Sequence, residues 1–151
     1  MPLPRFAVVD VETSGLSDRR HRILQLGAVL IEADGTVVDQ WSSLVRLQWP
    51  LQRVGPTRIH GITRPMLRGA PRLDTALDQL APLLNGAIFT AHNAEFDAGF
   101  ILRAAHRRTG FELGPQLCTL RMSRRLDPER HMSHRLIDVA ERYGVDLSAP
   151  H

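Results

Sequence analysis

Residues 6–11, FAVVDV, and residues 22–32, RILQLGAVLIE, are two short apolar runs near the start of the chain. Both are rich in branched side chains, which predicts β-strands. The Asp34-Gly35 pair that follows is a hairpin signal, and residues 37–47 then alternate apolar and polar side chains as a half-exposed strand does. The sequence therefore predicts an antiparallel meander of three strands.

The rest of the chain predicts helices that alternate with short strands. Proline and glycine recur through residues 49–71, which favours loops and short helical turns. Later elements are expected in the order helix, strand, helix, strand, helix, helix, at 73–84, 87–91, 94–108, 116–119, 119–126 and 133–143.

This order predicts an α/β fold in which a mixed five-stranded sheet, the antiparallel three-strand meander plus two parallel strands, is flanked by helices. Because crossovers between parallel strands are right-handed, the strand at 87–91 is expected beside the strand at 6–11. The carboxyl ends of these two strands then meet at one edge of the sheet.

The composition is that of one globular domain of 151 residues, of which 43% are hydrophobic and 23% charged. A single cysteine excludes an internal disulfide, and the sequence contains neither a signal-peptide core nor an apolar run of membrane-spanning length. We therefore expect a cytoplasmic protein.

All 19 basic residues are arginine, and many of them lie in the second half of the chain. Such a concentration favours an anionic polymer as partner, and solvated helix faces are the alternative. Arg103, Arg107 and Arg121 are the candidates for contacts with a nucleic-acid backbone.

Two carboxylates follow each other closely at the end of the first strand. Asp10 and Glu12 are two residues apart, so their side chains leave the same face about 7 Å apart along the backbone. Two acids on one face of an apolar strand repel each other unless a cation neutralises them, and hard oxygen ligands suit Mg²⁺ or Mn²⁺. A strand end that enters solvent is the simpler alternative for this pair taken alone.

A second acidic segment begins where the strand at 87–91 passes into a helix. Asp97 falls in the first turn of that helix, where an acid also interacts favourably with the helix dipole. Since the crossover places this segment beside Asp10, the sequence predicts that three carboxylates converge: Asp10, Glu12 and Asp97.

Three segments in order, DVETSGL at 10–16, IHGIT at 59–63 and HNAEFD at 92–97, resemble the signatures of the DEDD 3′-to-5′ exonucleases of the histidine subtype. Within that family the sequence is most similar to the proofreading epsilon subunits of bacterial DNA polymerase III. The resemblance runs from about residue 6 to the last residue and implies a ribonuclease H-like fold.

The resemblance also implies the roles of individual residues. Asp10, Glu12 and Asp97 would be catalytic and would hold two divalent cations, Mg²⁺ or Mn²⁺. The residues implied in binding the terminal nucleotide are Thr13, Ser14, Gly15, Leu16, His92, Asn93 and Phe96. The implied partners are a single-stranded or frayed 3′ end of DNA and a DNA polymerase.

The third motif of the family is a histidine followed five residues later by an aspartate. Residues 136–150 resemble the helix and loop that precede this motif in the family. The resemblance therefore places the catalytic histidine, which would be the general base, at His151. The aspartate is absent from this sequence, so residues 1–151 are expected to be a single exonuclease domain without its C-terminal helix and with weak or no activity.

His134 and Asp138, which are four residues apart, are an alternative source of a histidine and a carboxylate on one helix face. The apolar residues of the same helix are expected to form its buried face, and they are Leu136, Val139, Ala140 and Tyr143. Asp138 is then expected to face solvent.

The expected function is hydrolysis of DNA from its 3′ end by a two-metal-ion mechanism, which releases nucleoside monophosphates and would serve proofreading. Two alternatives stay open. One is a 3′-to-5′ exonuclease of the same superfamily that acts on RNA, and the other is a non-catalytic module that binds nucleic acid or a polymerase.

Overall fold

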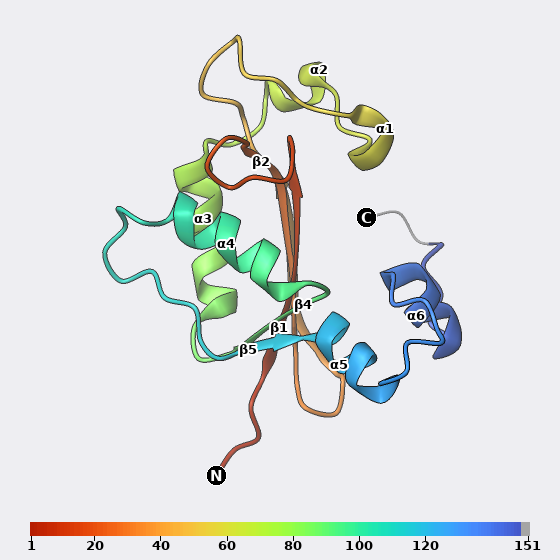
Figure 1. The fold of residues 1–151 in the computed structure, drawn as a ribbon. Helices are drawn as coiled ribbons and strands as arrows, with labels where there is room; N and C mark the ends of the chain where they lie inside the picture. The colour runs from red at the N-terminus through yellow and green to blue at the C-terminus, as the bar shows by residue number, and fades with distance from the viewer. Residues whose placement is uncertain (149–151) are drawn as a thin grey trace.

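A computed structural model of the chain describes residues 1–148, which form a five-stranded sheet in the order β3-β2-β1-β4-β5 (Figure 1). The strands are β1 (Phe6–Thr13), β2 (Ile23–Ile31), β3 (Val37–Leu44), β4 (Ile88–Ala91) and β5 (Gln116–Cys118). β1, β2 and β3 form the antiparallel meander, and β4 and β5 are parallel to β1. The predicted mixed five-stranded sheet is confirmed.

β1 is the central strand of this sheet, and its register positions the segment that follows β4. Val8 lies opposite Val29 of β2 on one side and Thr90 of β4 on the other. Since β4 ends at Ala91, the residues after it lie beside the last residues of β1. The predicted adjacency of the two strand ends is therefore correct.

The helices are α1 (Thr57–His60), α2 (Arg64–Leu67), α3 (Leu73–Leu84), α4 (Ala94–Ala104), α5 (Thr119–Leu126) and α6 (Leu136–Arg142). α3 and α4 cover one face of the sheet, and α6 lies on the opposite side (Figure 1). The core packs α3 and α4 against alternate residues of β1, and it includes Ala7, Val9, Val11, Leu77, Leu80, Phe100 and Ile101. Alternation along β1 leaves its other face available for polar side chains.

The segment between β3 and α3 is an excursion with a small apolar cluster of its own, formed by Leu24, Ile62 and Leu67. Gly55 in this excursion has a φ of +80° and lies directly against the backbone of Ser14. A Cβ atom at that position would collide with the Ser14 carbonyl oxygen. The excursion is thereby pressed onto the turn that follows β1.

Two helices are shorter than predicted. α4 ends at Ala104 instead of residue 108, and Arg108 folds back to form ion pairs with Asp74 and Asp78 on α3. α6 begins at Leu136 instead of residue 133, because the Ser133 hydroxyl bonds to Asp138 and to the Arg135 N–H, and such local bonds compete with helical ones.

The expected buried stripe on α6 is largely wrong. Ala140 is buried, whereas Leu136 and Tyr143 are exposed. Leu136 borders an open cavity instead of packing into the core. The helices of residues 1–148 include none that is long and apolar enough to cross a membrane.

Candidate active site

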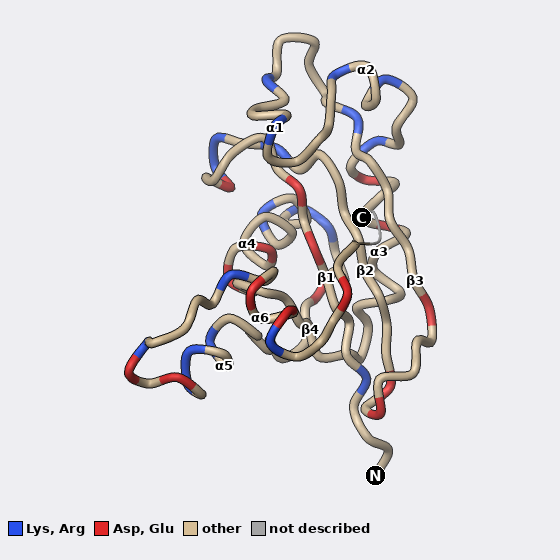
Figure 2. The backbone as a smooth tube through the Cα atoms, turned by 90° about the vertical axis from the view of Figure 1, so that its right-hand side faces the viewer, with Lys and Arg blue, Asp and Glu red and all other residues tan. Residues whose placement is uncertain are grey.

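Asp10 and Glu12 lie on the face of β1 that the core does not cover. The neighbouring Val9 and Val11 are buried, whereas Asp10 is exposed and Glu12 is half-buried. Both acids line a cavity of about 1070 Å³ that extends from the sheet to α6 and that His92 also borders. Figure 2, which views the molecule from the α6 side, shows the acidic positions along β1 in red.

Asp97 reaches the same strand end from the first turn of α4. Its Oδ1 accepts a hydrogen bond of 3.0 Å from the backbone N–H of Val11, and the residue is only 5% exposed. Burial and, next, the negative charge of Asp10, with a smaller contribution from Glu12, raise the pKa of Asp97 to about 7, against the opposing hydrogen bond from the Val11 N–H. Asp97 therefore lies within electrostatic range of both Asp10 and Glu12.

The chemistry of this donor set suits a hard divalent cation. Mg²⁺ and Mn²⁺ bind carboxylate oxygens, and a cation would remove the repulsion that disfavours a charged Asp97. As the side chains stand, residues 1–148 contain no group of three His, Cys, Asp or Glu residues arranged to hold a metal ion. One oxygen of Asp97 is already engaged by the backbone of β1. The ligand roles of Asp10, Glu12 and Asp97 therefore stay predictions.

The turn after β1 is held together by its own polar groups. The backbone N–H of Ser14 donates to the Arg22 carbonyl at 2.9 Å, and its hydroxyl oxygen accepts from the Arg22 N–H at 2.9 Å. The hydroxyl of Thr13 donates to the carbonyl of Gly15 at 2.7 Å. Leu16 projects outward with 86% exposure. Ser14 thus shapes the turn, and Leu16 is free to contact a ligand.

Gly15 is restricted by its neighbour rather than by its own backbone angles. A Cβ atom there would overlap the ring of His21, whose Nδ1 accepts a hydrogen bond of 3.0 Å from the Ser17 N–H. The turn therefore requires glycine at this position. The proposed contacts of residues 13–16 with a nucleotide stay predictions.

His92 is fixed at both ring nitrogens. Its Nδ1 lies 2.9 Å from the hydroxyl of Thr119, and its Nε2 lies 2.8 Å from the carbonyl oxygen of His134, to which it donates. Asn93 is exposed and adopts the left-handed conformation with a φ of 84°. Phe96 packs against Phe100 with ring centroids 5.0 Å apart. His92 thus faces the acidic cavity, while Phe96 also supports the core.

A buried polar cluster behind His92 was not expected from the sequence. The hydroxyl of Ser123 lies 2.8 Å from Nδ1 of His134, and Nε2 of His134 lies 3.2 Å from Oδ2 of Asp127. Asp127 also accepts from the backbone N–H of Met132 at 2.8 Å, which lowers the pKa of its carboxyl group, against the opposing effect of burial. This cluster anchors the carbonyl of His134 that holds His92.

The Ser123, His134 and Asp127 cluster is structural. Arg142 Nη2 donates to the Ser123 hydroxyl oxygen at 3.3 Å, and Ser123 is buried, so the hydroxyl is not available to attack a substrate. The spacing of these residues has no period that a sequence pattern would reveal. Thr119, which holds His92, escaped prediction for the same reason.

The alternative pair of His134 and Asp138 is not brought together. His134 turns towards Asp127, whereas Asp138 accepts hydrogen bonds from Ser133 Oγ at 2.5 Å and from Arg135 Nε at 2.6 Å. Asp138 is half-buried rather than turned fully to solvent. The predicted general base, His151, lies outside the described residues.

The sheet order and the acid-lined strand end define an α/β domain of the ribonuclease H-like class. Residues 7–151 match the RNase_T family, which is described as exonuclease. The chain therefore belongs to this exonuclease family, and its resemblance to DEDD-type 3′-to-5′ exonucleases is confirmed.

Similar proteins include DNA polymerase III PolC-type from Staphylococcus haemolyticus and from Staphylococcus aureus. Each is 37% identical over 152 residues, which cover 97% of this chain and 10% of the relative. The chain thus spans about a tenth of the length of these relatives.

Solved structures of exonuclease I share the fold. A product-bound structure superposes with a TM-score of 0.82 at 16% identity, covering 97% of this chain and 40% of that one. Escherichia coli exonuclease I in complex with a dT13 oligonucleotide gives a TM-score of 0.80 at 16% identity, with 96% and 37% coverage.

Proposed function

We propose that this chain is a 3′-to-5′ exonuclease domain that hydrolyses phosphodiester bonds of DNA and releases nucleoside monophosphates. The observation that carries the proposal is the electrostatic coupling of Asp10, Glu12 and Asp97 at the end of β1, in a chain of the exonuclease family. Repelling carboxylates beside a cavity of about 1070 Å³ support a site for cations and a charged substrate.

Asp10, Glu12 and Asp97 would hold the divalent cations, Mg²⁺ or Mn²⁺. When bound, such ions supply Lewis-acid chemistry, which makes water more acidic and stabilises the departing 3′-oxygen. The proposed proton acceptor is His151, because imidazole titrates near neutral pH.

The residues around the acids suit the binding of a terminal nucleotide. Leu16 offers an exposed apolar side chain at one end of β1, and His92 is held by Thr119 and His134 on the neighbouring strand end. Asn93 and Phe96 complete the proposed pocket. A frayed 3′ end enters such a site more readily than a paired one, so the site supports a proofreading role.

Association with a DNA polymerase is part of the proposal, because the PolC-type relatives are DNA polymerase III proteins. A mismatched 3′ terminus on a primer is then expected to be removed faster than a matched one. Equal rates for both termini would contradict the proofreading role and leave the nuclease assignment intact.

The test combines metal binding with product analysis. We expect Mn²⁺ binding, followed by electron paramagnetic resonance, and slow loss of single nucleotides from the 3′ end of a 5′-labelled DNA strand. The Asp10→Ala variant should lose both properties. Degradation from the 5′ end, or unchanged activity in Asp10→Ala, would contradict the proposal, and a strong preference for a matched RNA strand would change the substrate.

A further inference from the structure

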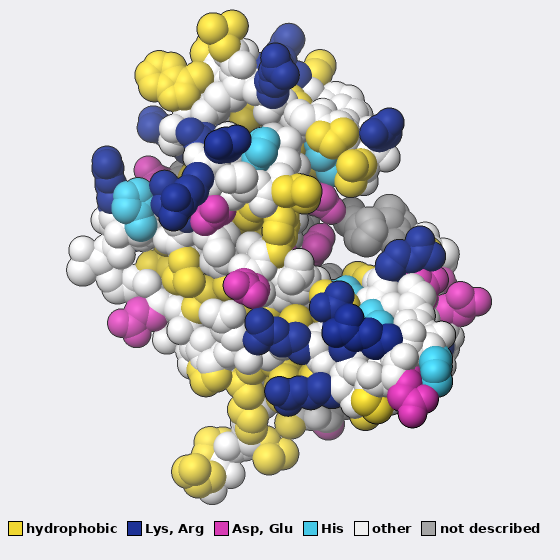
Figure 3. All heavy atoms as spheres, viewed as in Figure 1, with side chains coloured by type: hydrophobic (Ala, Val, Ile, Leu, Met, Phe, Trp, Pro, Cys, Tyr) yellow, Lys and Arg dark blue, Asp and Glu magenta, His cyan; other side chains and the backbone are white. Residues whose placement is uncertain are grey.

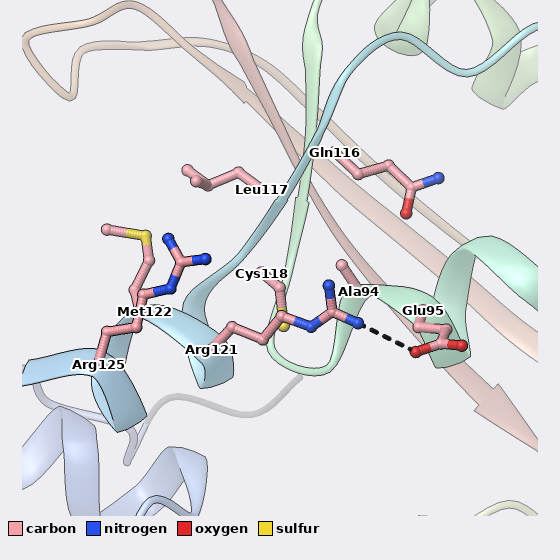
Figure 4. A pocket seen from close by; sticks show the side chains of 8 residues that line it. All are labelled: Ala94, Glu95, Gln116, Leu117, Cys118, Arg121, Met122 and Arg125. Carbon is pink, nitrogen blue, oxygen red and sulfur yellow. Dashed lines mark hydrogen bonds and ion pairs between the residues drawn. The ribbon is translucent and has the colours of Figure 1, made fainter. Parts of the chain in front are cut away.

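A second cavity, of about 380 Å³, lies between the first turn of α4, strand β5 and helix α5. Figure 4 shows its lining side chains, which are Ala94, Glu95, Gln116, Leu117, Cys118, Arg121, Met122 and Arg125. Its volume falls within the range of small-ligand pockets. None of these residues lines the cavity that contains Asp10 and Glu12.

Two guanidinium groups enter this cavity from α5. Arg121 forms one ion pair, of 3.3 Å, with Glu95, and both side chains are highly exposed, at 69% and 84% (Figure 4). Arg125 has no hydrogen-bond or ion-pair partner within residues 1–148. Figure 3 shows dark blue side chains gathered over this part of the surface. An exposed ion pair is worth little, so a phosphate can displace Glu95 from Arg121.

The base of the cavity also favours negative charge. Burial opposes ionisation of the Cys118 thiol, but the backbone N–H groups of Arg121, Ala94, Asn93 and Leu120 outweigh it and lower the pKa. These N–H groups belong to the start of α4 and of α5, which both point their positive ends at the cavity.

The second cavity adjoins the acidic one. His92 lines the acidic cavity, and Ala94, two residues later, lines the second cavity. Likewise, Thr119 lines the acidic cavity, and its neighbour Cys118 lines the second. Two residues span at most about 7 Å, so the two cavities are close enough for a strand of nucleic acid to reach the second within one or two nucleotides of the acidic one. Leu117 and Met122 add apolar surface on which a base can rest.

We propose that this second cavity binds phosphate groups of the substrate strand, 5′ of the nucleotide that is removed, with Arg121 and Arg125 as the cationic contacts. The inference rests on the proposed exonuclease function. An enzyme that removes the 3′ nucleotide leaves the whole remaining strand on the 5′ side, so a binding surface beside the site must meet 5′ phosphates.

The first test measures the salt dependence of binding. A fluorescein-labelled oligothymidylate of about 12 nucleotides is titrated with the metal-free protein between about 50 and 200 mM salt. The Arg121→Gln/Arg125→Gln variant should bind about tenfold more weakly, and the slope of log Kd against log salt should fall by about 1.4, which is about 0.7 for each lost phosphate contact. The loss should grow with oligonucleotide length.

A matched control removes two arginines elsewhere. Arg68 and Arg72 are exposed, lie outside both cavities and carry the same total charge, so Arg68→Gln/Arg72→Gln should keep the wild-type slope. Equal slopes for all three proteins, or equal loss in both variants, would overturn the inference. Failure of the exonuclease function is a separate result, seen when the wild-type protein neither binds Mn²⁺ nor hydrolyses the p-nitrophenyl ester of thymidine 5′-monophosphate.

The second test uses Cys118, which is the single cysteine of the chain and lines the cavity. Saturating oligothymidylate should slow alkylation of Cys118 by iodoacetamide several-fold in the wild-type protein and much less in Arg121→Gln/Arg125→Gln. Protection by poly-L-glutamate but not by the oligonucleotide would overturn the inference and assign the cavity to an acidic peptide.

Discussion

The two cavities of this domain differ in charge and in how their residues are held. Asp10 and Glu12 project from the central strand, and Asp97 is tied to that strand by the Val11 N–H. Arg121 and Arg125 project from the surface of α5 and are constrained at most by one exposed ion pair. The difference teaches that the fold holds the proposed metal ligands on a paired strand, whereas the arginines proposed to bind phosphate keep their freedom to adapt.

The largest expected effect is the loss of activity in Asp10→Ala. Loss of a ligand that stabilises transition-state charge should lower the rate by about a thousandfold or more. Folding should be preserved, because Asp10 is exposed and its charge opposes ionisation of Asp97. Single-turnover cleavage and thermal unfolding measure the two effects. Glu112→Ala, at another exposed acid, is the control and should keep both.

The next largest effect is expected at Gly55, which packs the segment between β3 and α3 against the turn after β1. Gly55 and Gly61 both have a positive φ, of +80° and +71°, but only Gly55 lies against the backbone of another segment. Gly55→Ala should therefore lower the free energy of unfolding by about 2–4 kcal/mol, and Gly61→Ala by about 1 kcal/mol. Urea unfolding measures both. Equal losses would show that Ser14 does not restrict the excursion.

A smaller effect is expected from the pH dependence of stability in the metal-free protein. The folded-state pKa of Asp97 is raised from 3.8 to about 7, so the folded chain holds a proton that the unfolded chain releases between these values. Stability therefore falls as the pH rises through this window. Asp97→Asn keeps an oxygen acceptor for the Val11 N–H. In this variant the free energy of unfolding should decrease by about 1–3 kcal/mol less across the same pH window than in the wild-type protein.

The measurement for Asp97 is urea unfolding in EDTA at several pH values. The two proteins share every other ionisable group, so the informative quantity is the difference between the wild-type protein and Asp97→Asn. Parallel curves for the two proteins would show that Asp97 ionises freely in the folded chain.

The acidic side of the comparison could be predicted from the sequence because it depends on regular backbone geometry. Alternation along β1 places Asp10 and Glu12 on one face, and a right-handed crossover brings β4 and the start of α4 beside them. The strand order, and with it the position of Asp97, follows from these two rules.

The arginine side could be predicted only in part. Arg121 was a candidate for backbone contacts, but the cavity that it shares with Arg125 depends on how β5 and α5 pack beside α4. The bonds from Thr119 and His134 to His92 likewise join residues that are far apart in the chain. Contacts of this kind leave no period in the sequence, so a pattern of apolar and polar residues cannot reveal them.

The smallest expected effect tests the adaptable side of the comparison. Glu95→Gln removes the ion-pair partner of Arg121 and one negative charge from the second cavity. Since an exposed pair of this kind is worth about 0.2–1 kcal/mol, affinity for the labelled oligothymidylate should rise by about two- to fivefold, with stability nearly unchanged. The gain should disappear in Glu95→Gln/Arg121→Gln, because the freed guanidinium is its source. Fluorescence anisotropy measures both variants, and weaker binding by Glu95→Gln would mean that Glu95 orients Arg121 for the phosphate instead of competing with it.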